Sequence, residues 1–279
     1  MQCFSPVALP ALTAAANVAL TSMPVHPIPI EKDTLMNLIH IPLRMGTIYL
    51  VPCQGGYLQV DTGYDRDYPA YRKGLQKVGL PITDIKYLLL THHHDDHAGF
   101  LNELTRDIPV TIIANRMSKE LLLTGKNDKT RGGGWVSPLI RTLAETKMRF
   151  DRNWTLEFPP LALRDQDILI DGDNCNILRE IGVAGDILYT PGHCIDHQVL
   201  VLDNGNVICG DAAANMLLFA GSHYCTVFMT DMEEAYSSWQ RMLDAGARMI
   251  YPTHGKAFPA TRLNEHMGKI KTSDLIRFF

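Results

Sequence analysis

A short apolar segment that runs directly into a cluster of histidines most constrains what this chain can fold into. The segment Tyr87-Leu88-Leu89-Leu90 is too short for a helix and is typical of a strand buried on both faces. After Thr91 the chain continues as His92-His93-His94-Asp95-Asp96-His97-Ala98-Gly99. Imidazole nitrogens and carboxylate oxygens suit zinc, and also iron or manganese. The pattern His-x-His-x-Asp-His therefore predicts a metal site in the loop after this strand.

Potential ligands also follow other apolar segments. His193, Asp211 and His254 each come shortly after a strand-like run, and Asp61 directly follows Tyr57-Leu58-Gln59-Val60. Loops at strand ends are where rigid scaffolds present reactive groups. The candidate ligands are His92, His94, Asp96, His97, His193, Asp211 and His254. These are more than one tetrahedral ion can use, so two neighbouring ions are expected.

The order of strand-like and helix-like segments predicts an α/β fold with layered sheets. In the first half, a hairpin at 48–60 is followed by a helix at 68–78, and strands at 85–90 and 110–114 come next. In the second half, Asp171-Gly172 and Asn204-Gly205 are typical of tight hairpin turns. A helix is expected at 231–245, with Thr230 and Glu233 as its capping box.

Composition narrows the class of protein. With 279 residues and 46% hydrophobic side chains, the chain can form one large domain. We expect a proline-rich lead-in at 1–40 and a single domain at 41–279. The formal net charge of -4 does not favour non-specific binding to nucleic acid, so a small molecule is the expected partner. No apolar run reaches 18 residues, so no membrane span is expected. Nothing in the sequence defines an oligomeric state.

The cysteines and the first residues bear on the compartment. The six cysteines are dispersed and form no CxxC pair, which favours reduced thiols in the cytoplasm. Residues 1–24 are apolar and rich in small side chains, but the first 31 residues contain no Lys or Arg. Pro6 and Pro10 also interrupt the apolar stretch. We therefore expect a cytoplasmic protein, and secretion by an atypical N-terminal signal, with removal of residues 1–24, is the alternative.

The segment 115–152 differs in charge from the remainder of the chain. It contains nine basic and four acidic residues, a balance of +5, so the other residues carry -9. One interpretation is a solvated insertion with three helical pieces. The other is a cover over the metals that selects an anionic substrate, with Lys129 and Arg131 among its contacts.

The seven candidate ligands, in this order, resemble those of the metallo-β-lactamase superfamily. The resemblance extends roughly from Thr47 to Phe258. It implies a four-layer αββα sandwich. It also implies that His92, His94 and His193 bind a first metal, that Asp96, His97 and His254 bind a second, and that Asp211 bridges both. Asp61 would orient one of the ligands.

This resemblance implies a hydrolase with two Zn²⁺ ions, with Mn²⁺ or Fe as possible replacements. Two cations that share a water lower its pKa from 15.7 to about 7, which supplies hydroxide at neutral pH. Asp96 is expected to accept a proton from that water. The segment 212–229 should pass near the metals, so His223 and Tyr224 are candidate substrate contacts.

Differences between this sequence and known branches of the superfamily narrow the range of expected reactions. The zinc β-lactamases of the first two classes resemble this chain but carry Cys where Asp211 stands, which disfavours lactam hydrolysis. The flavodiiron oxidoreductases carry Glu where His94 stands, and the acyl-homoserine lactonases usually carry Tyr where Ala214 stands. The expected reaction is the cleavage of a small ester, thioester or lactone. The alternatives are hydrolysis of a phosphodiester or phosphotriester, β-lactamase-type amide hydrolysis, mononuclear-iron oxygenation, and a metal-bound sensor without turnover.

Overall fold

Two large mixed β-sheets form the centre of the described part of the chain. The structure is a computed structural model, and it describes residues 38–128, 130–151 and 155–277. The lead-in expected at 1–40 falls almost entirely outside these ranges, and so does Lys129.

The first sheet has six strands in the order β1-β2-β3-β4-β5-β7. Their bounds are β1 (Ile39–Pro42), β2 (Thr47–Cys53), β3 (Gly56–Val60), β4 (Ile85–Leu89), β5 (Thr111–Asn115) and β7 (Ile168–Ile170). The expected hairpin joins β2 and β3 through Gly55, whose φ of 79° a residue with a Cβ rarely adopts. From β3 to β7 the neighbours are parallel, so these strands end at one edge of the sheet.

The second sheet has five strands in the order β13-β12-β10-β9-β8. Their bounds are β8 (Gly185–Tyr189), β9 (Gln198–Leu202), β10 (Asn206–Gly210), β12 (Met249–Pro252) and β13 (Phe258–Pro259). Strand β9 is antiparallel to both β8 and β10, and β10 is parallel to β12. Strands β8, β10 and β12 therefore run in the same direction and end at the same edge.

Helices and a small third sheet complete the described fold. The third sheet has the order β11-β6-β14, with β11 (Phe228–Met229), β6 (Gly134–Trp135) and β14 (Ile276–Arg277). The α-helices are α1 (Tyr68–Lys77), α2 (Asp95–Ala98), α3 (Leu101–Asp107), α4 (Ser118–Thr124), α5 (Pro138–Phe150), α6 (Ile177–Glu180), α7 (Met232–Asp244) and α8 (Thr261–His266). The 3₁₀ turns are η1 (Asp65–Asp67), η2 (Ile82–Asp84), η3 (Leu218–Ala220) and η4 (Thr272–Asp274). None of these helices is both long and apolar enough to cross a membrane.

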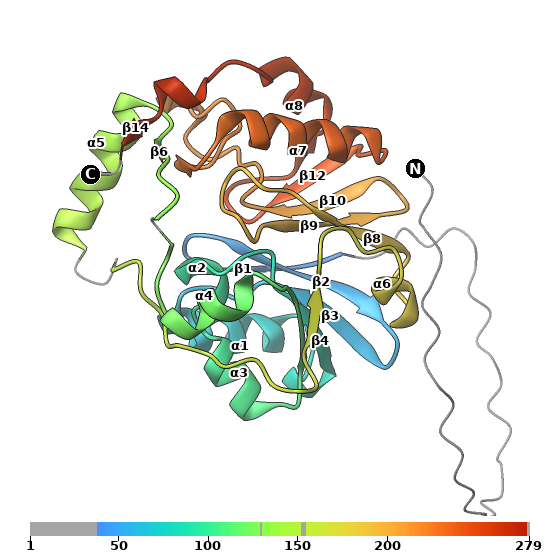
Figure 1. Ribbon diagram of the computed structural model, residues 1–279. Helices are drawn as coiled ribbons and strands as arrows, with labels where there is room; N and C mark the ends of the chain where they lie inside the picture. Colours follow the sequence, from blue (N-terminus) through green and yellow to red (C-terminus); the bar gives the residue numbers. More distant parts are fainter. Residues whose placement is uncertain (1–37, 129, 152–154, 278–279) are drawn as a thin grey trace, which may run out of the picture. The chain divides into compact units, whose positions relative to one another are not determined.

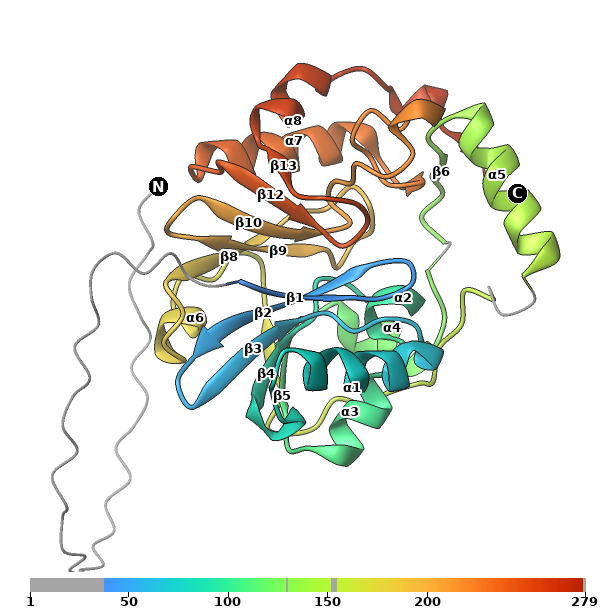
Figure 2. The ribbon, with the colours of Figure 1, turned by 180° about the vertical axis from the view of Figure 1, so that it is seen from behind.

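The two large sheets pack face to face between layers of helices (Figure 1 and Figure 2). Val51, Leu58, Leu200 and Ile208 belong to the buried cluster between the sheets. A second buried cluster joins the first sheet to α1 and α3, and a third joins the second sheet to α5, α7 and α8. The expected four-layer αββα sandwich is thus confirmed. Both views place α5 beside the sheets, apart from the outer helices.

The helices expected at 68–78 and 231–245 form as α1 and α7. Helix α1 buries Tyr71 and Leu75, and the chain leaves it through Gly79, whose φ is 74°. Helix α7 buries the apolar stripe of its sequence, including Trp239 and Met242. These apolar residues recur at helical spacing, which explains why both helices could be predicted.

Two details of the expected fold are wrong. Asp171-Gly172 is not a hairpin turn, because β7 belongs to the first sheet whereas Asn174, just beyond, pairs with Ile187 of the second sheet. Helix α7 is capped by Asp231, which accepts a hydrogen bond from Glu234 N at 2.9 Å. Thr230 instead donates its hydroxyl hydrogen to the backbone oxygen of His193 at 2.6 Å.

Where the structure describes the segment 115–152, it forms two helices, α4 and α5, with β6 between them, rather than three helical pieces. Several of its basic side chains are paired with carboxylates. Arg116 contacts Asp171 at 2.7 Å, Lys126 contacts Glu157 at 3.2 Å, and Arg141 contacts Glu145 at 2.7 Å. Asp171 and Glu157 lie outside the segment, so these two pairs offset part of its excess positive charge.

Candidate metal centre

The predicted ligands converge where strands of the two sheets end. The loop after β4, which includes α2, carries the ligands from His92 to His97. His193 follows β8, Asp211 follows β10 and His254 follows β12. Because β8, β10 and β12 end at one edge of the second sheet, their loops meet the loop after β4.

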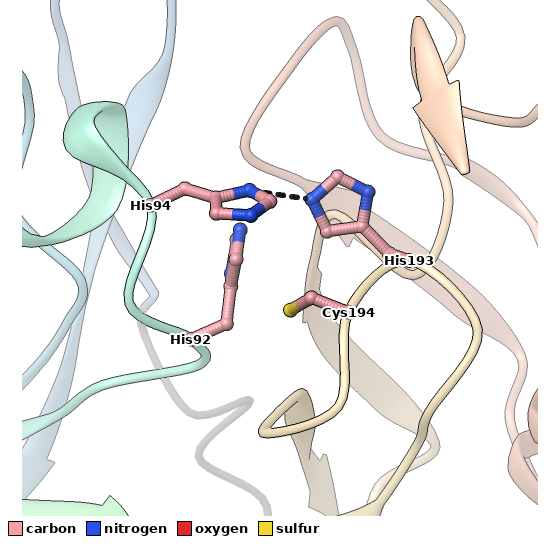
Figure 3. A group of neighbouring side chains, drawn as sticks. All are labelled: His92, His94, His193 and Cys194. Carbon is pink, nitrogen blue, oxygen red and sulfur yellow. Dashed lines mark hydrogen bonds between the residues drawn. The ribbon is translucent and has the colours of Figure 1, made fainter. Parts of the chain in front are cut away.

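His92, His94 and His193 form the first group of facing ligand atoms. Their nitrogens and the sulfur of Cys194 lie within 4.8 Å of one another. Figure 3 shows His92 and His94 on one loop and His193 on the loop opposite, with His193 Nε2 2.9 Å from His94 Nδ1. The Cys194 thiol donates to Asp196 Oδ1 at 3.2 Å, and burial raises its pKa well above the usual value. Because the thiol is engaged by Asp196, the three imidazoles are the candidate ligands of the group.

Asp96, His97 and His254 form a second group that meets the same 4.8 Å limit. Asp96 Oδ2 lies 3.1 Å from His254 Nε2, and Asp96 Oδ1 lies 3.7 Å from His97 Nε2. The side chain of Asp96 is 19% exposed, whereas that of His97 is fully buried. Asp96 is therefore the most exposed member of this group, since the side chain of His254 is 9% exposed.

Asp211 lies between the two groups. Its Oδ2 is 3.6 Å from His193 Nε2, while its Oδ1 is 3.4 Å from His97 Nε2 and 3.5 Å from His254 Nε2. One carboxylate oxygen thus faces each group. This is the arrangement that a bridging carboxylate requires.

Four of the five candidate histidines are anchored through Nδ1 and direct Nε2 into the centre. The Nδ1 partners are Thr91 Oγ1 for His92, Asp61 Oδ2 for His97, the Phe228 backbone oxygen for His193 and the Met45 backbone oxygen for His254. Metal-binding histidines usually have such a partner on the second nitrogen, which sets the tautomer and the ring orientation. His94 differs, because its Nδ1 points at His193.

Buried ligand atoms at the centre lack ordinary partners. His92 Nε2, His97 Nε2 and Asp211 Oδ1 are buried without a hydrogen-bond partner among the described residues. An unsatisfied buried polar atom costs roughly 1–3 kcal/mol, so three in one place need an explanation. Transition-metal ions bound by nitrogen and oxygen would satisfy all three, and the residues present therefore fit such ions.

The electrostatics of the centre favour neutral imidazoles in the first group. Burial, reinforced by neighbouring imidazoles, holds the pKa of His92 and His94 well below the usual value. Burial acts in the same direction at His254, but the Asp211 and Asp96 carboxylates outweigh it and raise its pKa to about 9. Neutral imidazoles keep a lone pair free for a metal.

Asp61 lies beside the start of the loop that carries the candidate ligands. Its Oδ1 accepts a hydrogen bond from Thr91 N at 2.7 Å, and its Oδ2 accepts one from Thr91 Oγ1 at 2.8 Å while contacting His97. Its φ of 60° lies in the left-handed region, which Asp and Asn tolerate better than other side chains. The carboxylate thus positions His97 and the start of the ligand loop together.

Two cavities of appreciable size border the ligands, beside a third of only about 10 Å³. One, of about 90 Å³, is lined by His94, Asp96, His193 and Asp211 together with Asn127 and Trp135. The other, of about 330 Å³, is reached past Asp96, Asp211 and His254. Tyr64 and Val227 line both cavities. Tyr64 was not predicted, although it directly follows the Asp61-Thr62-Gly63 turn in the sequence.

The predicted substrate contacts that the structure describes, His223, Tyr224 and Arg131, do not line these cavities. The rings of His223 and Tyr224 instead contact His266, and Tyr224 also packs on Phe258. Arg131 lines a separate cavity near Thr272 and Arg277. Lys129 lies outside the described residues. His223 and Tyr224 were predicted to contact substrate only because they follow Asp211 closely in the sequence. The fold of the 212–229 loop directs them toward His266 instead.

Comparison with known proteins places this fold and this centre in one class. The sequence model described as the metallo-beta-lactamase superfamily matches residues 41–254, most of the chain. The chain therefore belongs to the metallo-beta-lactamase superfamily. Its described residues include groups of His and Asp side chains able to hold metal ions.

Individual relatives are more distant. The Beta-lactamase-like protein 2 homolog of Drosophila melanogaster is 27% identical over 224 residues, covering 80% of this chain and 61% of that protein. The homolog of the same name from Caenorhabditis elegans is 26% identical over 239 residues, covering 82% of this chain and 65% of that protein. The chain thus spans less than two thirds of the length of these curated relatives.

Solved structures share the fold at lower identity. An archaeal metallo-beta-lactamase superfamily protein from Sulfolobus tokodaii has a TM-score of 0.57 and 18% identity, covering 83% of this chain and 85% of that chain. A subclass B3 metallo-beta-lactamase of Bradyrhizobium japonicum has a TM-score of 0.56 and 16% identity, covering 80% and 76%. This likeness concerns the fold alone.

Proposed function

We propose that this protein is a dinuclear-zinc hydrolase that cleaves a small ester, thioester or lactone. The observation that carries the proposal is the position of Asp211, with one oxygen toward His193 and the other toward His97 and His254. His92, His94 and His193 would hold one ion, and Asp96, His97 and His254 the other. Bound zinc would act as a Lewis acid and supply hydroxide at neutral pH.

Asp96 is the proposed proton carrier. Its Oδ2 is engaged by His254, whereas its Oδ1 is 3.7 Å from the nearest imidazole nitrogen of His97 and beyond hydrogen-bond distance from it. Asp96 also lines both cavities, so a reacting group in either one meets this carboxylate. The carboxylate would take up the proton of the attacking water and return it to the departing oxygen or sulfur.

Tyr64 is a proposed hydrogen-bond donor to the substrate. It lines both cavities, and burial together with the nearby Asp96 carboxylate raises the pKa of its hydroxyl above the usual range. The hydroxyl therefore stays protonated. It can donate to the carbonyl oxygen of a bound ester, on which negative charge develops during attack.

The test is a substrate panel assayed with zinc-, manganese- and iron-reconstituted protein. It contains lactones, thioesters, simple esters, a β-lactam and bis-nitrophenyl phosphate, and the metal content is measured on the same preparations. We expect about two zinc ions per chain and turnover of an ester, thioester or lactone. Turnover of the phosphodiester or the β-lactam alone, or a single iron with oxygenase activity, would replace this proposal by the corresponding alternative.

A cytoplasmic location and a small-molecule partner belong to the same proposal. Cys53, Cys175, Cys194, Cys209 and Cys225 are all free thiols in the described residues, which supports a reducing compartment. The formal charge of -4 and the local pairing of basic side chains in 115–152 support a partner other than nucleic acid.

A further inference from the structure

The larger of the two cavities beside the metal centre has an apolar wall. Its volume of about 330 Å³ falls within the range of roughly 300–1,000 Å³ that is typical of small-molecule sites. Helix α5 contributes Ile140, Leu143 and Ala144, and the loop that contains η3 contributes Leu217 and Phe219. The wall therefore comes from two segments that lie far apart in the sequence.

The cavity is continuous with the proposed centre. Asp96, Asp211 and His254 form one end of it, so a group bound there is held next to the reacting atoms. Lys147 also lines the cavity, and it lies three residues beyond Ala144 on α5. The methylene stem of a lysine adds apolar surface even where its ammonium stays hydrated. A ligand with an apolar body and one polar, cleavable end matches this arrangement of an apolar wall beside polar candidate ligands.

Apolar side chains at this cavity are left open to water. Phe219 is 78% exposed and Leu143 is 40% exposed, although both line the cavity. Exposed apolar surface in a concave site is covered favourably by an apolar ligand. The residues of the segment 115–152 that line this cavity are the apolar side chains of α5 together with Lys147, whereas Asn127, Asp128 and Trp135 line the smaller cavity.

We propose that the cavity binds an apolar acyl chain of the substrate, so that the protein selects medium-chain acyl esters or thioesters over acetyl ones. The identity of the cleavable bond rests on the proposed function, whereas the binding of the acyl chain does not depend on it. Burial of each further methylene contributes about 0.8 kcal/mol, or roughly a fourfold gain in affinity. The gain should stop when the chain fills the cavity.

Binding of the apolar chain can be measured without turnover. Straight-chain alcohols from butanol to decanol are titrated into the zinc-loaded full chain and into the metal-free protein by calorimetry. We expect the dissociation constant to fall roughly fourfold per methylene and then to level off. A negative heat-capacity change should accompany binding, because apolar surface is buried. Dissociation constants that do not depend on chain length would overturn the proposal.

Two substitutions on α5 locate the site. Ala144→Phe places a ring in the cavity wall and should remove the dependence on chain length. Thr146→Phe adds similar bulk at an exposed position of the same helix and should leave the dependence intact. If Ala144→Phe does not fold, Leu143→Asp is the second variant, because its half-exposed position tolerates a polar group and the charge would weaken binding of the longer alcohols. Equal chain-length dependence in the wild type and in the folded cavity variant would exclude this cavity.

Turnover is measured separately on acyl esters and thioesters from acetyl to decanoyl. If alcohol binding depends on chain length but no ester, thioester or lactone is cleaved, the cavity assignment stands and the proposed function fails. If esters are cleaved at rates that do not depend on chain length, the proposed function stands and the proposed selection of medium-chain substrates fails. A stable dimer that buries α5 and binds no alcohol would show that a second copy, rather than a substrate, covers this face.

Discussion

Asp61 Oδ2 lies 2.7 Å from Nδ1 of His97, although 36 residues separate the two in the sequence. Both groups are almost completely buried, and the same carboxylate also accepts hydrogen bonds from the backbone and hydroxyl of Thr91. One side chain at the end of β3 therefore orients a candidate ligand that follows β4. The parallel pairing of β3 with β4 makes this possible, because the two strands end side by side.

The first prediction concerns this carboxylate. In Asp61→Asn, the backbone can keep its φ of 60°, because Asn also tolerates the left-handed region. The amide no longer offers a charged acceptor to the His97 ring. Loss of such a partner typically weakens metal binding by roughly 10–100-fold, and we expect a loss of that size. Competition with a chromophoric chelator measures it. The control is Asp65→Asn, which makes the same substitution at an exposed position four residues later, and this variant should bind zinc as the wild type does.

The second prediction concerns stability. If the unsatisfied atoms of His92, His97 and Asp211 bind metal, zinc must stabilise the folded chain. At free zinc about 1,000 times the dissociation constant, the gain is about 4 kcal/mol, or on the order of 10 °C in Tm. Thermal unfolding with and without a chelator measures this difference. Asp211→Asn should lose most of the shift, whereas the exposed Asp244→Asn should keep it. A zinc shift as large in Asp211→Asn as in the wild type would contradict the assignment of the bridge.

Much of the fold and of the centre was readable in the sequence because it depends on local patterns. The strand before His92 is a continuous apolar run, and the apolar stripe of α7 recurs at helical spacing. The candidate ligands follow the ends of such strands. Contacts between distant segments were not readable. The backbone oxygen of Met45 accepts a hydrogen bond from Nδ1 of His254, and no pattern of side chains in the sequence indicates that contact. His223 was misplaced because a loop can turn away within a few residues of a ligand.

The third prediction separates chemistry from metal binding. In Asp96→Asn the candidate proton carrier is lost, while His97 and His254 remain as ligands of the same ion. Removing a positioned acid–base group typically lowers kcat by about 10²–10⁴-fold, and we expect that range on the best substrate of the panel. Metal content is measured on the same preparation, because the result bears on proton transfer only if both ions are retained. Full turnover in a metal-replete Asp96→Asn protein would remove Asp96 from the mechanism.

The fourth prediction concerns Asp167, which lies far along the chain from the ligands and links β5 to the loop before β7. Its Oδ1 accepts hydrogen bonds from Ile112 N at 3.0 Å and Arg164 Nη2 at 2.8 Å. Burial would raise the pKa of this carboxyl, but the hydrogen bonds from Arg164 and Ile112 outweigh burial and lower it. In Asp167→Asn we expect a loss of about 1–3 kcal/mol in the free energy of unfolding at pH 7.

The lowered pKa of Asp167 also sets the pH dependence of that loss. The unfolded chain takes up a proton at Asp167 near pH 3.9, whereas the folded chain does so only at lower pH. The stabilisation is therefore complete above about pH 5 and is lost as the pH falls through the folded-state pKa. Denaturant unfolding of the metal-free proteins should show a difference between wild type and Asp167→Asn that shrinks below about pH 4. The control is Asp165→Asn at an exposed position, whose free energy of unfolding should differ little from that of the wild type at any pH. If the loss of stability in Asp167→Asn instead grew on acidification, the Asp167 carboxylate would oppose folding.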